Sequence, residues 1–324
     1  MKRFAIAGCL GLAAIAGAVL PAAAQSNYPN RPVRVILPFG AGGVADITAR
    51  VVSERLGDKL GQRFIIENMP GAGGIAAARG ALSAAPDGYT LALLSNGTAV
   101  SVPLFKSLPF DPLKDFVPIS SLGYFDFVIG TNADSEFKTM KDALAYGKAN
   151  PGKLNVGTIN IGSTQNLSAE LLKSAAGVQF QIIPYRGTPE VIIATLRNDV
   201  NIMSDNYSAM KSNLQDGKIR AIATTGEKRS VVLKDVPTVQ ESGVAGYDVV
   251  SWNAFFAPKG TPKEVVDRLS AALKDVLAQP DVKARLLDLG IEAQWSTPEE
   301  IQGRLKSDID KWGKVIEQAG IQKQ

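Results

Sequence analysis

Two glycine-rich turns hold the residue types in this sequence that are best suited to bind an anion. They span residues 38–46 (PFGAGGVAD) and 157–166 (GTINIGSTQN), and each follows an apolar strand-like run and precedes a run with helical spacing. A helix that starts directly after such a turn presents free N–H groups and the positive end of its dipole. Glycine lets a ligand approach the backbone closely because it has no Cβ atom. The candidate ligand-binding residues are Phe39, Ala41, Gly42, Gly43, Asp46, Thr158, Ile161, Gly162, Ser163, Thr164, Asn166 and Asp205.

The ligand that suits these two turns is a carboxylate. Four charge-assisted hydrogen bonds of about 1.5–3 kcal/mol each would supply about 6–12 kcal/mol before the ordering cost of binding. Micromolar affinity needs about 8 kcal/mol, so two uncharged turns suffice without an arginine clamp. The alternative is that such turns are ordinary features of α/β folds and bind nothing. This alternative is disfavoured because the two turns occupy corresponding positions in the two predicted lobes. Nucleotide binding is disfavoured because the sequence has neither the full Gly-x-Gly-x-x-Gly spacing nor a Gly-Lys-Ser/Thr phosphate loop.

Charged and aromatic side chains near these turns have two interpretations each. Asp46, close to the start of a predicted helix, either stabilises the free amides of that helix or faces a ligand ammonium or hydroxyl. Asp205, which follows an apolar strand, has the same alternatives. Arg186 either reaches a distal carboxylate of the ligand or forms a surface ion pair, and the ion pair is favoured. Trp252 lies in an aromatic stretch that is assigned to hinge and core packing rather than to the ligand.

The composition argues against catalysis. The chain has no histidine among its 324 residues, which removes Ser-His-Asp and Cys-His centres and most zinc chemistry. Its one cysteine, Cys9, lies in a segment that we expect to be removed, so neither a thiol nor a disulfide is expected in the mature protein. The formal charge is +4, and about +2 without Lys2 and Arg3, with the positive residues scattered. We therefore expect no cofactor, no metal and no nucleic-acid partner.

The first residues have the layout of a secretory signal peptide. Lys2 and Arg3 precede an apolar run over residues 4–19, and the small residues at 21–24 suit a signal peptidase. A membrane anchor is disfavoured because the run is short and rich in alanine and glycine. A lipoprotein attached through Cys9 is disfavoured because only five residues separate Arg3 from Cys9. We expect residues 1–24 to be cleaved on export to the periplasm.

The remaining chain alternates strand-like and helix-like segments, which predicts an α/β fold with two lobes. Apolar stretches over 117–130 and 252–257 have no helical period and would cross between the lobes as a hinge. The predicted boundaries are 25–122 for the first part of lobe 1, 123–252 for lobe 2, and 253–324 for the return to lobe 1 and the C-terminal helices. A ligand would bind in the cleft between the lobes, and a hinge motion would close them.

A series of short motifs makes the sequence resemble the Bug-type periplasmic solute-binding receptors of tripartite tricarboxylate transporters over essentially the whole mature chain. The matching segments are 28–34 (YPNRPVR), 38–46, 67–74 (EN and PGAGG), 86–90 (PDGYT), 184–187 (PYRG), 235–238 (DVPT) and 257–262 (AP and GTP). The resemblance implies a type II periplasmic-binding fold that closes like a Venus flytrap. It also implies that the two turns pinch one carboxylate, partly through ordered water, and that the receptor delivers it to membrane permease subunits driven by an ion gradient.

Several positions depart from the pattern of these receptors and leave the ligand open. Gly40 and Ala41 stand where a residue followed by proline is frequent, Asn160 stands where glycine is common, and Asn166 replaces a usual histidine. Dicarboxylates, tricarboxylates, amino acids and aromatic acids are all compatible ligands. We expect a monomeric receptor that is not an enzyme. The alternatives are a periplasmic hydrolase or lyase that uses carboxylates such as Asp46, and a receptor that reports its ligand to a membrane sensor.

Overall fold

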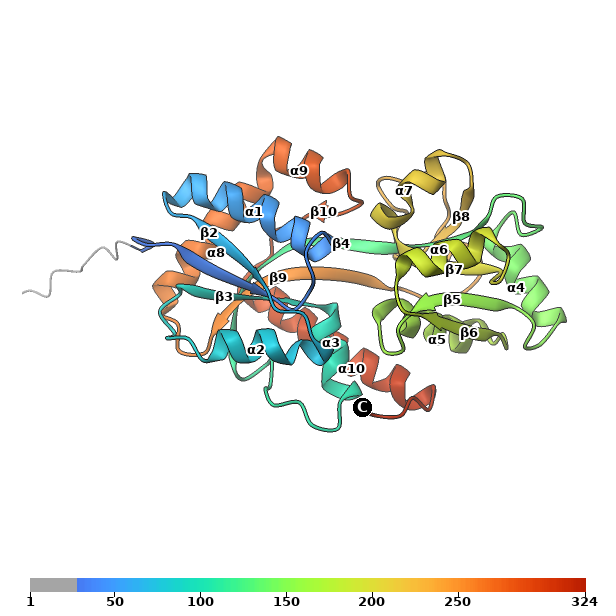
Figure 1. Ribbon diagram of the computed structural model, residues 1–324, viewed down its shortest axis with the longest axis horizontal. Helices are drawn as coiled ribbons and strands as arrows, with labels where there is room; N and C mark the ends of the chain where they lie inside the picture. Colours follow the sequence, from blue (N-terminus) through green and yellow to red (C-terminus); the bar gives the residue numbers. More distant parts are fainter. Residues whose placement is uncertain (1–27) are drawn as a thin grey trace, which may run out of the picture.

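A computed structural model describes residues 28–324, and its strands and helices alternate along the chain (Figure 1). The signal peptide predicted over residues 1–24, with Cys9, lies outside the described residues. The strands are β1 (Val33–Leu37), β2 (Phe64–Asn68), β3 (Thr90–Ser95), β4 (Phe116–Asn132), β5 (Asn155–Ile159), β6 (Gln181–Tyr185), β7 (Ile202–Asn206), β8 (Ile219–Thr224), β9 (Val250–Pro258) and β10 (Glu292–Ala293). The helices are α1 (Val44–Leu60), α2 (Ile75–Leu82), α3 (Asn96–Leu104), α4 (Met140–Ala149), α5 (Thr164–Ala176), α6 (Thr188–Leu196), α7 (Tyr207–Gln215), α8 (Lys263–Ala278), α9 (Pro280–Leu287) and α10 (Pro298–Gln318), with the short 3-10 helix η1 (Ala72–Gly74) before α2. The predicted α/β fold class is confirmed.

Two neighbouring strands, β4 and β9, connect the two halves of the molecule (Figure 1). β9 pairs with β3 on one side and with the first part of β4 on the other, as far as Asp126. Beyond Asp126, β4 leaves β9 and pairs with β7 and β8 instead. The stretches predicted to be extended, 117–130 and 252–257, are therefore strands, and β4 is the one that enters both sheets. The lobe boundaries proposed after residues 122 and 252 stay predictions.

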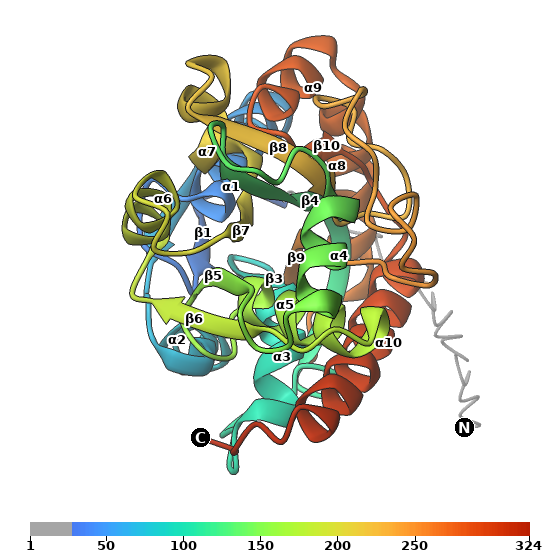
Figure 2. The ribbon, with the colours of Figure 1, turned by 90° about the vertical axis from the view of Figure 1, so that its right-hand side faces the viewer.

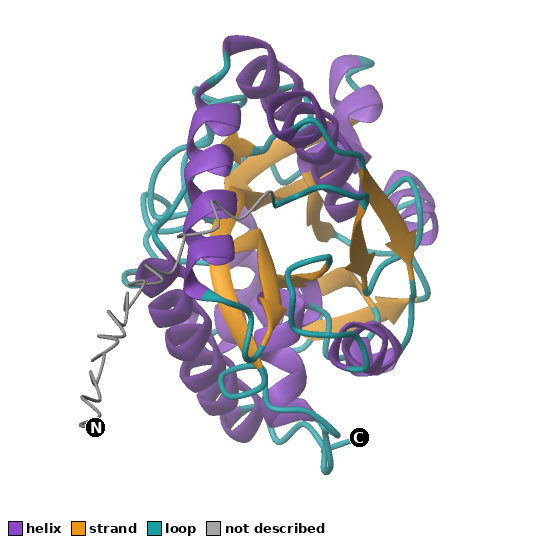
Figure 3. Cartoon of the chain, turned by 90° about the vertical axis from the view of Figure 1, so that its left-hand side faces the viewer, coloured by secondary structure: helices purple, strands orange, loops and turns teal. Residues whose placement is uncertain are grey.

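Each half is built around three parallel strands. In the first half β2, β1 and β3 lie side by side in that order, and in the second half β6, β5 and β7 do. The helices lie outside the strands in both end-on views (Figures 2 and 3). All six residues of β3 are buried, as expected for a strand that is covered on both faces. Among the described residues, no helix has the length and apolar character that crossing a bilayer requires.

Aromatic side chains of β9 pack the first sheet against its helices. Trp252 and Phe256 join one apolar cluster and Phe255 joins another, because successive side chains of a strand point to opposite faces. All three have no exposed surface, so they are core residues as predicted. The Trp252 Nε1–H donates to the Asp308 carboxylate of α10 at 2.7 Å, and Arg304 donates to the same carboxylate at 2.8 Å. The bond from Trp252 fixes α10 to the strand that runs beside β4, and Arg304, on α10 itself, holds the Asp308 carboxylate in place.

Asp126 lies where β4 passes from one sheet to the other. Because of this residue we expect the free energy of unfolding to depend on pH. Burial raises the pKa of the Asp126 carboxyl to about 6, and its Oδ2 atom has no hydrogen-bond partner. From about pH 4 to about pH 6 the unfolded chain releases this proton while the folded protein keeps it, so the free energy of unfolding falls as the pH rises.

We expect Asp126→Asn to be more stable than the unsubstituted protein by about 2 kcal/mol at about pH 7. At about pH 4 the two should be separated by a smaller difference, because Asp126 is then protonated in the folded protein and about half protonated in the unfolded chain. Urea unfolding at the two pH values measures both differences. A stability difference that stays constant over this range would contradict the raised pKa.

Candidate functional site

A cavity of about 300 Å³ lies where strands from both halves of the molecule end. β1, β3, β5 and β7 each lead into a helix there, namely α1, α3, α5 and α7. Ligands commonly bind at the carboxyl ends of α/β strands, because loops and helix N-termini gather at that edge. The lining is uncharged and consists of Phe39, Gly43, Val44, Ala45, Ser95, Gly97, Phe125, Phe127, Ile159, Gly162, Ser163, Thr164, Gln165, Asn206, Ser251 and Asn253.

The first glycine-rich turn presents the amino end of α1 to this cavity. The first backbone hydrogen bond of α1 joins the Ile47 N–H to the Gly43 carbonyl at 3.0 Å. The N–H groups of Val44 and Ala45 therefore have no acceptor within the helix. Both residues line the cavity, together with Phe39 and Gly43. Two such donors at the positive end of a helix suit an anion.

Asp46 lies behind this turn and holds it in place. Its carboxylate accepts hydrogen bonds from the Gly42 N–H at 2.9 Å, from Arg50 Nε at 3.0 Å and from Asn68 Nδ2 at 2.9 Å. Burial by itself would raise the pKa of Asp46, but these hydrogen bonds outweigh it and hold the pKa below its usual value. Asp46 is outside the cavity lining. The geometry agrees with the interpretation in which Asp46 stabilises the backbone amides of the turn.

The second glycine-rich turn presents the amino end of α5 to the same cavity. Ser163 caps this helix, since its Oγ accepts the Asn166 N–H at 3.1 Å. The first backbone hydrogen bond of α5 joins the Leu167 N–H to the Ser163 carbonyl at 2.9 Å. The N–H groups of Thr164 and Gln165, which line the cavity, therefore have no acceptor within the helix.

Asn166 and Thr158 hold the second turn from behind. The Gly162 N–H donates to Asn166 Oδ1 at 3.2 Å, and Asn166 Nδ2 donates to Thr158 Oγ1 at 3.2 Å. Asn166 and Thr158 are buried outside the lining, whereas Gly162 faces the cavity. Gly162 has a φ of 80°, a left-handed backbone conformation that favours glycine. The polar residues of this turn thus serve mainly to shape its backbone.

The two halves of the molecule touch at the cavity through Thr164. Its Oγ1 accepts a buried hydrogen bond of 2.9 Å from Asn96 Nδ2 at the start of α3. Trp312 Nε1 donates to Asn96 Oδ1 at 2.8 Å and so fixes which end of the Asn96 amide points to Thr164. Because Thr164 Oγ1 accepts from Asn96, its own hydroxyl hydrogen is left for another acceptor, such as a ligand in the cavity.

Sequence reasoning missed part of the lining. Ser95 and Gly97 belong to a third strand-to-helix turn, which the Ser-Asn-Gly sequence after the predicted strand at 89–94 signals. Phe125 and Phe127 lie on β4 with their rings edge to face and 6.0 Å between centroids. Asn253 lies on β9. No local motif marks these strand residues, because only the pairing of β4 and β9 brings them to the cavity.

The remaining predicted site residues lie outside the lining. Ala41, Gly42 and Ile161 are on the two turns, and 56% of the Ile161 surface is exposed. Arg186 precedes α6, where its backbone N–H donates to Glu190 at 3.0 Å. Asp205 is fully buried at the end of β7, and burial raises the pKa of its carboxyl. Direct ligand contact by these residues stays a prediction.

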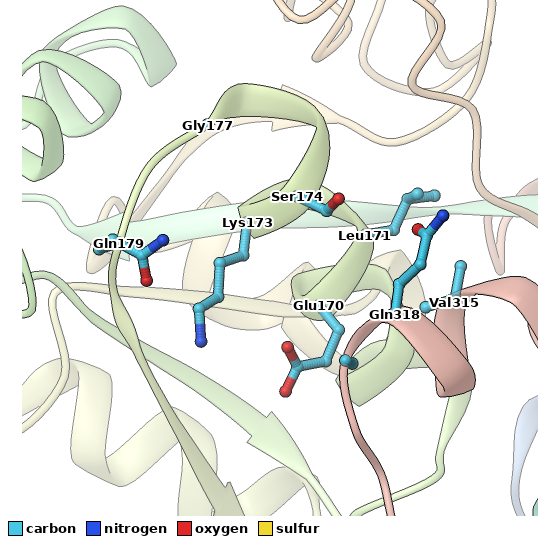
Figure 4. Close-up of a pocket in the computed structure, with 9 residues that line it drawn as sticks. Glu170, Leu171, Lys173, Ser174, Gly177, Gln179, Val315 and Gln318 are labelled. Carbon is cyan, nitrogen blue, oxygen red and sulfur yellow. The ribbon is translucent and has the colours of Figure 1, made fainter.

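A second hollow, of about 310 Å³, lies between the carboxyl end of α5 and the end of α10 (Figure 4). Glu170, Lys173 and Gln318 contribute side chains to it, and burial raises the pKa of Glu170. The amides of α5 are bonded within the helix at this end, so they offer no free donors. Within residues 28–324 no group of three or more metal-binding side chains occurs. The cavity at the strand ends is therefore the candidate site.

Comparison with known proteins identifies the family. Residues 48–321 match the model of the tripartite tricarboxylate transporter family receptor, TctC. The chain belongs to this family. BugT of Bordetella pertussis is 32% identical to this TctC receptor over 309 residues, which are 95% of this chain and 94% of BugT. The UPF0065 protein of the gbd 5' region of Cupriavidus necator is 36% identical over 312 residues, 96% of this chain and 94% of the relative.

Solved structures of similar proteins share the fold of this TctC receptor. The periplasmic binding protein BugD has a TM-score of 0.77 and 34% identity, over 92% of this chain and 100% of BugD. An R. palustris protein with adipate has a TM-score of 0.80 and 32% identity, over 90% of this chain and 98% of that one. MatC from Rhodopseudomonas palustris with bound malate has a TM-score of 0.75 and 34% identity, over 89% and 100%.

These comparisons confirm the predicted resemblance to Bug-type receptors. The family is one of receptors, and BugD is a periplasmic binding protein. This TctC receptor is accordingly a solute-binding protein of the periplasmic-binding type, and it is not an enzyme.

Proposed function

We propose that this TctC receptor binds a small carboxylate in the cavity between its two glycine-rich turns. The observation that supports this most directly is that α1 and α5, from opposite halves, both direct amides without helical acceptors to one cavity. The lining has no carboxylate that would repel the ligand and no cation that would compete with the amides. The turns therefore provide the charge complement, through backbone dipoles alone.

The ligands of two structural neighbours support a carboxylate. One neighbour was solved with adipate and MatC was solved with malate, and both compounds are carboxylates. Their chains are 32% and 34% identical to this one over about nine-tenths of its length, as the coverage of 90% and 89% indicates. A shared anion site built from backbone amides accommodates such sequence divergence, because it depends on turn geometry more than on side chains.

We further propose that the protein is exported, that cleavage after Ala24 releases it, and that it delivers its ligand as a monomer to permease subunits of a tripartite transporter. The family model supports the transporter partner. Two contacts between the halves suit a receptor that signals its loaded, closed state. These are the Asn96–Thr164 hydrogen bond at 2.9 Å and the Lys211–Asp288 ion pair at 2.5 Å.

The enzymatic alternative finds no support in the site. A hydrolase or lyase that used Asp46 and Asp205 would need their carboxylates at the ligand, and neither residue lines the cavity. The Asp46 carboxylate already accepts hydrogen bonds from Gly42, Arg50 and Asn68. No feature of the described residues favours a membrane sensor over a permease as the partner, and the family description favours the permease.

A thermal-shift screen of small carboxylates, followed by calorimetry, tests the proposal. An acid at about 100 times its dissociation constant should add about 2.7 kcal/mol to the free energy of unfolding, while its neutral primary amide should add far less. The acid should be recovered unchanged after incubation with the protein. If the amide stabilises the protein as much as the acid does, or if no acid binds, the carboxylate proposal is wrong.

Replacing Thr164 with valine should weaken the binding of such an acid about tenfold, because the variant loses a hydroxyl hydrogen that is left for the ligand and also the oxygen that accepts from Asn96. Thr164→Ser keeps that hydroxyl and should stay within about threefold of the unsubstituted protein. Calorimetry with the best acid of the screen measures both affinities. Equal affinities for the valine and serine variants would place the ligand away from the start of α5.

A further inference from the structure

Asp205 accepts hydrogen bonds from two side-chain amides. It lies behind the part of the cavity lining that comes from α5 and β7. Gln165 Nε2 donates to Asp205 Oδ1 at 3.0 Å, and Asn206 Nδ2 donates to the same oxygen at 3.2 Å. The Asn206 backbone N–H adds a third bond to this oxygen at 2.7 Å. The Thr188 hydroxyl donates to the other oxygen, Oδ2. Asp205 has no exposed surface and does not itself line the cavity, whereas Gln165 and Asn206 do.

This arrangement fixes the direction of both amides. A carboxylate oxygen accepts hydrogen bonds, so it takes the NH₂ end of each amide and leaves the C=O end turned away from Asp205. Both residues line the cavity, and within the described residues neither carbonyl oxygen accepts a hydrogen bond. Asn206 Oδ1 is in fact buried without a hydrogen-bond partner in the protein. A buried carbonyl without a donor is unfavourable, so a ligand that supplies a donor gains affinity there.

No hydrogen bond joins these two carbonyl oxygens to the other residues of the lining. Phe127 pairs with Asn206 across β4 and β7, and Phe125 packs edge to face on Phe127. The backbone amides without helical acceptors lie at the starts of α1 and α5, where the proposed carboxylate binds, and Asn253 Nδ2 on β9 is a further donor of the lining without a partner in the described part of the chain. A second carboxylate next to the Gln165 and Asn206 oxygens would face like partial charges, and a methylene group would leave both oxygens unsatisfied.

We infer that the ligand carries a hydroxyl or amino donor on its carbon chain, which Gln165 Oε1 and Asn206 Oδ1 recognise, and that Asp205 is the positioning residue that orients both amides. The inference rests on the proposed carboxylate function. It deepens that function by naming the second recognised group. Hydroxy acids and amino acids share this N–H or O–H chemistry, and the protein should prefer them to the acids that lack the donor.

Matched pairs of acids test the preference by calorimetry. Malate and aspartate are compared with succinate, and lactate and alanine with propionate, so that each pair differs at one donor group. In at least one pair the substituted acid should bind at least about tenfold more tightly than its partner. The hydroxy and amino members of each set show which donor is preferred. Equal or tighter binding of the unsubstituted acids overturns this inference and leaves the proposed function intact, whereas the absence of binding by every acid overturns both.

Asn206→Leu removes the acceptor with little change in volume. In this variant the hydroxy or amino acid should bind no more than about twofold more tightly than the unsubstituted acid. The loss should come mainly from weaker binding of the hydroxy or amino acid, while the unsubstituted acid keeps its affinity. Asn213→Leu makes the same change outside the cavity, on the helix α7 that follows Asn206, and serves as the matched control, which should keep the tenfold preference. If Asn206→Leu also retains the preference, Asn206 does not recognise the donor group of the ligand.

Asp205 is tested by comparing leucine with asparagine at its position. Asp205→Leu releases both amides and should lower the preference to within about threefold. Asp205→Asn still offers an oxygen to Gln165 and Asn206, and its NH₂ group can donate to the Thr188 hydroxyl oxygen, so it should recover most of the preference. An asparagine variant that behaves like the leucine variant would show that the orientation of the amides is not what Asp205 contributes.

Discussion

Replacing Gly162 with alanine is expected to lower the affinity for the ligand about 100-fold. Gly162 has a φ of 80°, where a Cβ atom costs about 1–2 kcal/mol, and that Cβ would overlap the buried side chain of Leu104. Leu104 ends α3 in the first half of the molecule, whereas Gly162 lies in the second half. The methyl group therefore distorts the turn and also keeps the start of α5 away from α3, where the two halves must meet to enclose a ligand. Together these costs amount to about 3 kcal/mol.

Calorimetry with the best acid of the screen measures the effect, and Gly40→Ala is the matched control. Gly40 lies in the first glycine-rich turn, and a Cβ atom there would have no neighbour within 4 Å. Its affinity should stay within about threefold of the unsubstituted protein. Adding Leu104→Ala to Gly162→Ala should recover part of the loss, because it removes the overlap and leaves the backbone strain. Unchanged affinity in Gly162→Ala alone would mean that the second turn does not take part in binding.

Replacing Asp46 with alanine is expected to lower the free energy of unfolding by about 3 kcal/mol and the ligand affinity about 30-fold. The substitution leaves the Gly42 N–H, Arg50 and Asn68 without the carboxylate that they share. Without the hydrogen bonds to the Asp46 carboxylate, the turn before α1 loses the conformation that directs the Val44 and Ala45 amides to the cavity. Affinity falls although Asp46 does not line the cavity.

Urea unfolding and calorimetry on the same preparations separate the two effects of Asp46. Asp58→Ala is the control on the same helix, since Asp58 is exposed and its pair with Arg55 is a surface contact. It should change the stability by less than about 0.5 kcal/mol and leave the affinity as it is. Asp46→Asn keeps the size of the side chain but loses the charge that Arg50 pairs with, so an intermediate loss is expected. An alanine variant with full affinity would show that the turn keeps its shape without Asp46.

The sequence by itself determined the fold class and the two turns of the site. Strand-to-helix alternation is a local pattern, and so the parallel strands and the helices after them were predictable from hydrophobic spacing. The turn at 38–46 is local in the same sense, since its glycines, its helix start and Asp46 all fall within nine residues of one another. The helix α3 was not predicted, because its sequence NGTAVSVPL is almost wholly buried and contains a glycine and a proline in place of an amphipathic period. The helix α7 was missed as well, because in its sequence YSAMKSNLQ only Met210 is buried and the apolar spacing is weak.

Only the tertiary structure decided which residues share the cavity and which stand behind it. Asp46 and Asp205 look similar in the sequence, because each is an acidic residue close to the end of a strand. In the structure both are buried outside the cavity lining, each in a hydrogen-bond network of its own. Phe125, Phe127 and Asn253 reach the site because β4 runs beside β9 and then beyond it into the second sheet. The reason is that pairing between strands more than 100 residues apart depends on the whole packed core, as with Asp126 and Val250. Local sequence can specify a turn and the helix that follows it, whereas the meeting of two turns across a cavity depends on how both sheets pack.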